Sequence, residues 1–291
     1  MFTQLFGHYL LNKNYINAQQ LQKALEAKNE TRVKLGALAI DAGYMTAGQV
    51  EKVHEEQKRL DKRIGDIAVS MGFLTEAQVD ELLSKQKTAN IVIGQTLIDL
   101  GYMTNADFEK ALSEYKANAG FTGDNSDEAG LAESLSAMFA LDDMDNKDYY
   151  IEYLLLFVRN MVRFIGDDFA FAGCVRNPET KNEYLCSQDI KGAINAYTAI
   201  GGDKNAFYAL ATRYAGEEIS DDEFAEACAG EFLNLQNGLF AVNLSNTQNT
   251  ELDLTPQISE KDVTLNMDDG IQVSLTFSFG TLNVTIAINK A

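Results

Sequence analysis

Glycines recur at a fixed period through the first 116 residues of the chain. The period is 29 residues, and it is carried by two series of glycines: Gly7, Gly36, Gly65 and Gly94, and then Gly43, Gly72 and Gly101. A constant period of this length is typical of repeat proteins, in which each repeat is one supersecondary unit. One unit cannot bury its apolar face alone, so neighbouring units must pack together. The first part of the chain is therefore expected to be an array.

The four repeated units have the same internal pattern. They read "FGHYLLNKNYINAQQLQKALEAK", "LGALAIDAGYMTAGQVEKVHEEQ", "IGDIAVSMGFLTEAQVDELLSKQ" and "IGQTLIDLGYMTNADFEKALSEY". In the third, Gly72 is placed to end a first helix and Thr75 to cap a second, in which apolar residues recur at helical spacing. Each unit is expected to be a helix, a turn and a helix, so residues 1–116 are predicted to form an all-α helical repeat domain.

The second and third units open with a basic residue and close with glutamine. The first of them runs from Lys34-Leu35-Gly36 to Gln57, and the next from Arg63-Ile64-Gly65 to Gln86. This frame resembles the MshEN domain at the front of type II secretion and type IV pilus ATPases, in which paired helical motifs bind cyclic di-GMP. The resemblance implies cyclic di-GMP as a ligand, held by Lys34, Gln57, Arg63 and Gln86.

Lys34 departs from this family, which has an arginine there. Arginine can stack on guanine and form two parallel hydrogen bonds with it, and lysine does neither well. The first and fourth units lack both the basic residue and the glutamine. The preferred interpretation is therefore that the repeats form an array that contacts other proteins, and nucleotide binding is the second hypothesis.

The formal charge of −19 lies almost entirely in the second part of the chain. Residues 1–118 carry 14 Lys and Arg against 15 Asp and Glu, and residues 119–291 carry 10 against 28. An acidic surface repels phosphate backbones and anionic membranes, and the chain has no long basic cluster. Nucleic-acid binding is not expected.

Other sequence features bear on location and chemistry. The N-terminus lacks the pattern of a secretory signal, and the most apolar run, "YYIEYLLLFVRNMVRFIG", is interrupted by charges, so no membrane insertion and a cytoplasmic location are predicted. Three cysteines, Cys174, Cys186 and Cys228, form no CxxC pair and are expected to be reduced packing residues. Both histidines precede residue 60, which excludes histidine-based catalysis or metal binding in the acidic part.

The remainder of the chain is predicted to be a linker followed by an α+β domain. Residues 117–146 are rich in Gly, Ser and Asp around one amphipathic stretch, 131–141, and are expected to be a linker. Residues 147–291 then contain helices over 147–166 and 203–214, a long helix from Ser220 past Phe240, and strands near 184–190, 193–200, 263–267, 271–279 and 281–288. Residues 271–279 alternate apolar and polar side chains, which predicts a half-buried antiparallel strand. Such an order predicts an antiparallel sheet with long helices on one face.

The long helix has an unusual stripe of small residues around a polar pair. At 100° per residue, with Glu231 at zero, the expected core face spans about 40° to 200°; it holds Leu235, Cys228, Leu239, Phe232, Ala225, Phe240 and Leu233. Asn234 falls on the other side, among Ala227, Gly230, Gly238 and Ala241. Glycine inside a helix costs about 1 kcal/mol relative to alanine. The stripe is therefore interpreted as a surface that a partner approaches closely, with Ala227, Gly230 and Gly238 as docking residues.

This helix resembles the signature of the CheX/CheC family of chemotaxis phosphatases. That signature is Glu-x-x-Asn with a proline about two dozen residues later, before a strand, and here Glu231-Phe232-Leu233-Asn234 is followed by Pro256. The single motif is nearer to the one-site, dimeric CheX type, so a homodimer is expected. The family often has Asp or Ser four residues before the glutamate, where this chain has Ala227.

The resemblance implies a catalytic role for Glu231 and Asn234. The substrate would be the aspartyl phosphate of a CheY-type response regulator. Asn234 would hold the attacking water in line with phosphorus, and Glu231 would pair with the lysine of the regulator's phosphate site. The Mg²⁺ ion would belong to the regulator, and the chain would need no cofactor of its own. The alternative is a catalytically silent signalling adaptor with two modules, or a cyclic di-GMP receptor.

Overall fold

The computed structural model describes residues 2–86, 91–118, 128–248 and 250–290, which form two compact units. The first comprises residues 1–123 and the second residues 124–291. Within the described ranges, no helix is both long enough and apolar enough to cross a membrane.

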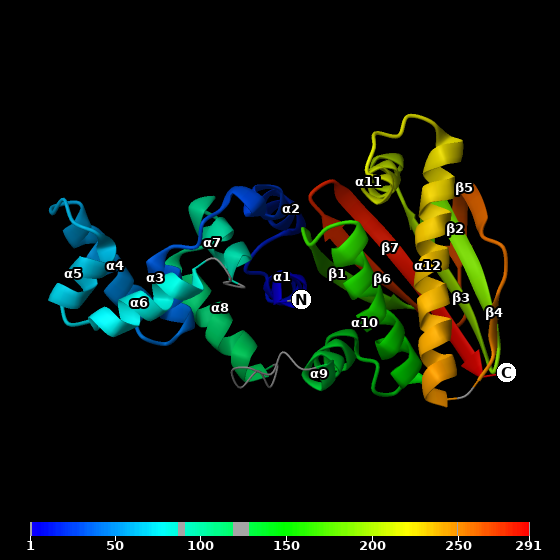
Figure 1. Cartoon of the computed structure of the whole chain (residues 1–291), viewed down its shortest axis with the longest axis horizontal. Helices are drawn as coiled ribbons and strands as arrows, with labels where there is room; N and C mark the ends of the chain where they lie inside the picture. Colours follow the sequence, from blue (N-terminus) through cyan, green and yellow to red (C-terminus); the bar gives the residue numbers. More distant parts are fainter. Residues whose placement is uncertain (1, 87–90, 119–127, 249, 291) are drawn as a thin grey trace. The chain divides into compact units, whose positions relative to one another are not determined.

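The first unit contains the four predicted helix–turn–helix repeats. Their helices are α1 (Phe2–Asn12) and α2 (Ala18–Ala27), α3 (Leu35–Asp41) and α4 (Ala47–Gln57), α5 (Ile64–Ser70) and α6 (Glu76–Lys85), and α7 (Val92–Asp99) and α8 (Asn105–Asn118), with a short 3₁₀ turn (Lys28–Glu30) after α2 (Figure 1). The turn inside each repeat needs a left-handed residue. Gly43, Gly72 and Gly101 supply it with φ near +70°, and in the first repeat Asn14 does so with φ 57°.

The other series of glycines brings the two helices of a repeat together. A methyl group on Gly36 would lie 2.7 Å from Val50 Cγ1, and one on Gly94 would lie 2.3 Å from Phe108 Cε2. Both distances are far inside van der Waals contact. The glycine is therefore required because the second helix packs directly onto it.

The repeats do not simply pack in chain order. The helices of the first repeat, α1 and α2, contact α7 of the fourth, and α1 also contacts α8. At this contact Phe6 lies edge-on to Phe108, with ring centroids 6.4 Å apart, and to Tyr115, at 5.2 Å. Because all three side chains are buried, the aromatic cluster closes the array between its first and last repeats.

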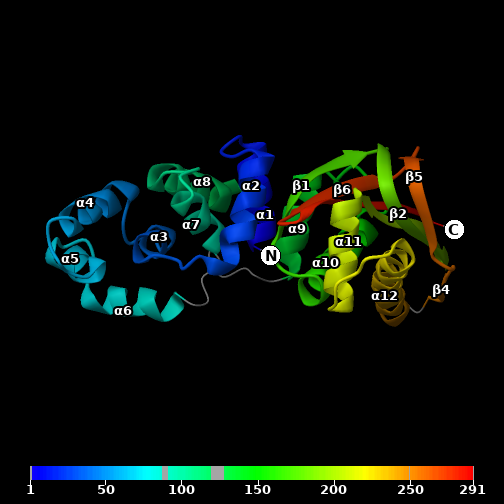
Figure 2. The same cartoon turned by 90° about the horizontal axis from the view of Figure 1, so that it is seen from above.

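The second unit is one antiparallel sheet with helices on one face, which confirms the predicted fold class (Figure 2). Its helices are α9 (Glu128–Phe139), α10 (Lys147–Phe164), α11 (Lys204–Ala215) and α12 (Asp222–Gln248). Its strands are β1 (Phe169–Arg176), β2 (Glu179–Gly192), β3 (Ile194–Gly202), β4 (Leu252–Leu254), β5 (Ile258–Asn266), β6 (Ile271–Phe277) and β7 (Gly280–Lys290). The strand order is β1-β6-β7-β3-β2-β4, with β5 pairing a separate stretch of β2.

The prediction of a linker over 117–146 is wrong for residues 128–146. Residues 119–127 lie outside the described residues, but α9 packs on α10 as part of the second unit. Leu135 and Leu141 are fully buried, and the ring of Phe139 lies edge-on to Phe171 of β1 at 5.1 Å. The amphipathic stretch 131–141 thus belongs largely to a helix of the second unit, and its apolar side packs into the core.

Three local predictions in the second unit need correction. Strand β1 was not expected. The long helix is capped by Asp221 and not by Ser220, because the Asp221 carboxylate accepts a 2.8 Å hydrogen bond from the Phe224 amide. Strand β6 is not half-buried, since Gln272 and Thr276 are only 5% and 4% exposed. It lies between β1 and β7, so neighbouring strands flank its polar residues on both sides.

Candidate functional site

Glu231 and Asn234 lie one helical turn apart on α12, which packs on β2 and β4. Glu231 is exposed and Asn234 is partly exposed. Within the described part of the chain, the Glu231 carboxylate makes no hydrogen bond or ion pair. The exposure predicted for Glu231 is thus observed and its carboxylate is available to a partner, whereas Asn234, predicted to lie on the open side of the helix, is only partly exposed.

The buried side of α12 is rotated relative to the predicted core face. Leu239, expected in the core, is 40% exposed, while Gly230 and Ala241, expected on the open stripe, are buried. Glu231 consequently lies near the middle of the exposed face, and Asn234 lies at its edge, where the helix meets the sheet. A helical projection fixes only relative angles, and the position of β2 and β4 decides which side is covered.

The proposed docking residues therefore divide into two groups. Gly230 is wrong as a docking residue, because a methyl group there would lie 3.6 Å from Gln257 Cβ and 3.7 Å from Cys186 Sγ of the same unit. Ala227 is exposed, and a methyl group on Gly238 would meet nothing nearer than Leu254 Cδ1, at 3.9 Å. Position 230 faces the sheet of its own unit, where a methyl group would make only ordinary van der Waals contact, and Ala227 and Gly238 remain docking candidates.

The Asn234 carboxamide is held from the inside by Gln188. Gln188 Nε2 donates to Asn234 Oδ1 at 2.8 Å and also to the backbone carbonyl of Thr255 at 2.8 Å. Thr255 is fixed in turn on β2, because its amide donates to Asp189 O at 3.0 Å and its hydroxyl accepts from the Asp189 amide at 3.1 Å. The segment before Pro256 is thereby pinned beside Asn234.

Gln188 belongs to a buried polar cluster between α10, α12 and the sheet. Asn237 Nδ2 donates to Gln188 Oε1 and to Thr198 Oγ1, both at 2.8 Å, and the Tyr153 hydroxyl donates to Asn237 Oδ1 at 2.8 Å. Thr198 donates its own proton to Gln188 O at 2.9 Å. Tyr153, Thr198 and Asn237 are 0% exposed, and burial raises the pKa of Tyr153 well above its ordinary value. The phenol therefore remains a neutral donor at neutral pH.

Sequence reasoning missed Gln188, Thr198 and Asn237. Two signals were available. Gln188 occupies the same side of β2 as Cys186 and Ile190, and Asn237 falls on the helix side that holds Leu233 and Phe240. Polar side chains at such positions need buried partners, but sequence alone does not show that these partners meet each other.

The four nucleotide-binding candidates of the first unit fall into two pairs, and Lys34, Gln57 and Gln86 are bonded within the unit. Lys34 Nζ pairs with Asp99 at 2.7 Å, and Gln86 accepts from Arg32 at 2.9 Å and donates to Val33 O. A separate bond joins Gln57 Nε2 to Lys62 O at 3.3 Å, next to Arg63. Asp99 places a carboxylate beside Lys34 on an exposed part of the surface, and a phosphodiester anion bound by Lys34 would have to displace it.

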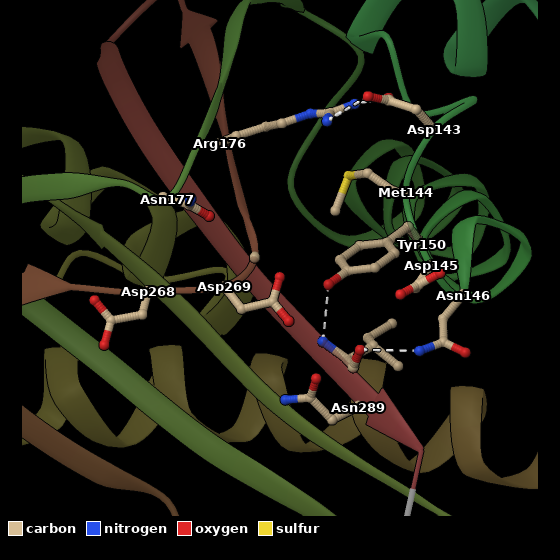
Figure 3. Close-up of a pocket in the computed structure, with 12 residues that line it drawn as sticks. Asp143, Met144, Asp145, Asn146, Tyr150, Arg176, Asn177, Asp268, Asp269 and Asn289 are labelled. Atoms are coloured by element: carbon tan, nitrogen blue, oxygen red, sulfur yellow. Dashed lines mark hydrogen bonds and ion pairs between the residues drawn. The ribbon is translucent and has the colours of Figure 1, made fainter.

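A separate cavity of about 650 Å³ lies in the second unit, and none of the residues that line it belongs to α12 (Figure 3). It is formed where α10 begins, β7 ends and two strand turns meet, and its walls carry Asp143, Asp145, Asp268 and Asp269. Arg176 pairs with Asp143, and the Tyr150 hydroxyl accepts from the Ile288 amide at 2.9 Å. Over the described ranges, no group of three or more His, Cys, Asp or Glu side chains is arranged to hold a metal ion.

Comparison with known proteins gives similarities at the level of solved structures. No protein-family model matches the chain, and no curated protein matches it. The C-terminal half is similar to a CheC-like superfamily protein from Shewanella sp. PV-4, with 17% identity, TM-score 0.45, and coverage of 50% of this chain and 99% of that one. A CheX from Desulfovibrio desulfuricans matches with 14% identity and TM-score 0.43, covering 49% and 99% of the two chains.

A third similar structure is a CheX–CheY–BeF₃–Mg²⁺ complex from Borrelia burgdorferi. It matches with 16% identity and TM-score 0.42, and covers 49% of this chain and 99% of that one. These identities are too low to carry a residue's role from one chain to another.

Proposed function

We propose that the second unit hydrolyses the aspartyl phosphate of a CheY-type response regulator. One observation carries this proposal: on the outer face of α12, an unengaged carboxylate, Glu231, stands one turn from a carboxamide, Asn234, whose oxygen is anchored from inside the fold. An exposed polar pair on a helix usually meets only water. Here a buried hydrogen-bond cluster ends on Asn234, which indicates that the orientation of its carboxamide is important for function.

The reaction requires no covalent bond between the phosphoryl group and this chain. Water attacks phosphorus, the bond between phosphorus and the aspartyl oxygen breaks, and the products are the regulator's carboxylate and dihydrogen phosphate, which keeps both water protons. Positioning the water is the main contribution that a helper protein can make. Asn234 is neutral and does not repel the phosphoryl group, while Glu231 offers a charge-assisted hydrogen bond to a lysine of the partner. The regulator supplies the Mg²⁺ ion.

The exposed face of α12 fits a protein partner. Phe224, Leu239 and Val242 are 39%, 40% and 54% exposed and lie on the same side as Glu231. Exposed apolar side chains grouped around a polar centre are typical of interaction sites. Helix positions 224, 231, 235, 239 and 242 have the spacing with which a helix face docks on a groove or a flat surface.

Ala227 favours a second candidate, in which the unit binds a response regulator without hydrolysing its phosphate. It is exposed one turn before Glu231, so no third polar side chain lies on this part of the face. A silent adaptor of this kind would bind the regulator through the same surface.

The dephosphorylation rate of a regulator separates these two functions. CheY-type regulators from the organism that encodes this chain are phosphorylated with acetyl phosphate and Mg²⁺, and their decay is followed with and without the full chain. Asn234→Ala is expected to lower kcat by about 100-fold, the order found when one preorganised hydrogen-bond group is removed from an active site. Asn243→Ala, the same change at a partly exposed position of the same helix, should keep the native rate. Equal decay with the native chain and Asn234→Ala would reject the catalytic assignment.

A further inference from the structure

We propose that Gln188 is a positioning residue for the reaction, which fixes the carboxamide of Asn234 in one of its two orientations. This inference rests on the proposed phosphatase function. The relevant contact joins β2 to α12: Gln188 Nε2 lies 2.8 Å from Asn234 Oδ1. Gln188 is 2% exposed and does not itself reach the surface where a regulator would dock.

The direction of this hydrogen bond is set by groups that cannot reverse. The carbonyl of Thr255 can only accept, and it lies 2.8 Å from the same Nε2 atom of Gln188. The amide end of Gln188 must therefore face Thr255 and Asn234. Gln188 Nε2 has two protons, of which one goes to the Thr255 carbonyl and the other points at Asn234. The atom of Asn234 that faces Gln188 must therefore be its acceptor, Oδ1.

The Oε1 end of the Gln188 side chain is also fixed by hydrogen bonds. Thr198 donates its single hydroxyl proton to Gln188 O, so its oxygen is left to accept from Asn237 Nδ2. Asn237 Nδ2 then donates its second proton to Gln188 Oε1, and Asn237 Oδ1 accepts from the Tyr153 hydroxyl. Each amide proton of Gln188 Nε2 and Asn237 Nδ2 has one acceptor, so a flip of either amide would bring like groups together.

The consequence for Asn234 is a defined outward face. Its Nδ2 group points away from Gln188 with both protons available, and its Oδ1 keeps one lone pair beyond the one that Gln188 uses. A water can then donate one proton to Oδ1, while Nδ2 donates to a phosphoryl oxygen. With the carboxamide reversed, the donor would lie inside and the site would lose the group that faces the developing charge.

Substitution of Gln188 tests this role through kcat and KM. Gln188→Met keeps the length of the side chain and removes its hydrogen bonds. It is expected to lower kcat for the phosphorylated regulator about 10-fold and to leave KM within two-fold, because the docking face is unchanged. Combined with Asn234→Ala, it should add no further loss in kcat, since a positioning residue acts only through its target.

Asn160→Leu is the matched control for a purely structural role. It removes a buried carboxamide, whose Nδ2 donates to Gln236 Oε1 at 2.7 Å, and leaves the bond between Gln188 and Asn234 in place. We expect a lower melting temperature and a kcat within two-fold of the native value. An unchanged kcat in folded Gln188→Met, or losses that multiply in the double variant, would overturn the inference while leaving the proposed function intact.

A measurement on the native chain keeps the inference testable if Gln188→Met does not fold or if no regulator is dephosphorylated. Side-chain amide NMR should show the Gln188 NH₂ protons protected from exchange and one set of Asn234 NH₂ signals. Fast exchange of the Gln188 protons, or two sets of Asn234 signals, would contradict a fixed carboxamide. Full activity of Asn234→Ala would instead reject the proposed function itself.

Discussion

Tyr153→Phe tests the energetics of the buried polar cluster behind the site. The substitution removes only the hydroxyl, so the ring keeps its contacts with Phe157 and Phe240, at centroid distances of 6.4 and 5.2 Å. Asn237 Oδ1 then loses the donor that lies 2.8 Å away, in a place with no access to solvent. An unsatisfied buried acceptor costs about 1–3 kcal/mol. For a unit of this size, a loss of about 2 kcal/mol lowers the melting temperature by roughly 4–8 °C.

Differential scanning calorimetry of the full chain measures this shift, and the same helix provides the control. Tyr149 also donates a hydrogen bond, to Gln248 Oε1 at 2.9 Å, but this bond is exposed to solvent. Tyr149→Phe should therefore change stability by less than about 0.5 kcal/mol. If both variants shift the transition of the second unit equally, the cluster does not stabilise the fold as described.

Three further predictions concern other parts of the chain. Gly94→Ala should destabilise the first unit by about 1–2 kcal/mol in thermal unfolding, because overpacking against Phe108 outweighs the gain in helix propensity. The control is Gly48→Ala, where an added methyl group has nothing within 4 Å and the effect should be neutral or slightly stabilising. Equal effects of the two substitutions would refute the close approach of Phe108 to Gly94. Arg213→Ala should lower the free energy of unfolding in urea by about 3 kcal/mol, because it leaves the buried Asp168 carboxylate without its cationic partner. Burial opposes ionisation of Asp168, but hydrogen bonds from Arg213 and Ser278 outweigh it and hold its pKa below the ordinary value. The stability that ionised Asp168 contributes is present above about pH 4 and is lost as the pH falls further. The native chain should therefore lose more stability in acid than Arg213→Ala does. Calorimetry with cyclic di-GMP and the full chain at micromolar concentration should give no heat, and micromolar binding would show that the four candidate residues rearrange.

The repeats could be predicted from sequence because their signals are local. A left-handed residue in each turn, which is glycine in three of the repeats, and a capping residue three positions later recur in the chain, and the structure places both as expected at Gly72 and Thr75. The packing of the first repeat on the fourth could not be predicted. Each repeat presents a similar apolar face, so the pattern does not say which face meets which, and aromatic contacts such as Phe6 with Phe108 decide it.

The candidate site was predicted in its outward part and missed in its inward part. Glu231 and Asn234 belong to one helix, so helical spacing alone places them on one side. The bond between Gln188 and Asn234 joins residues 46 positions apart on different elements. The Leu239 error has the same origin, because the faces of a helix that are covered depend on neighbours that the helix itself does not specify.

The most direct test of the central claim compares binding and turnover in Asn234→Ala. Affinity is measured by calorimetry with the regulator activated by beryllofluoride and Mg²⁺, and the rate is measured with the same regulator carrying its phosphate. If Asn234 orients the water and docking depends on Glu231 and the apolar face of α12, Asn234→Ala should bind with an affinity within about three-fold of native and have a kcat about 100-fold lower. A native rate, or a loss of rate explained entirely by lost affinity, would contradict the assignment of Asn234 as the catalytic residue.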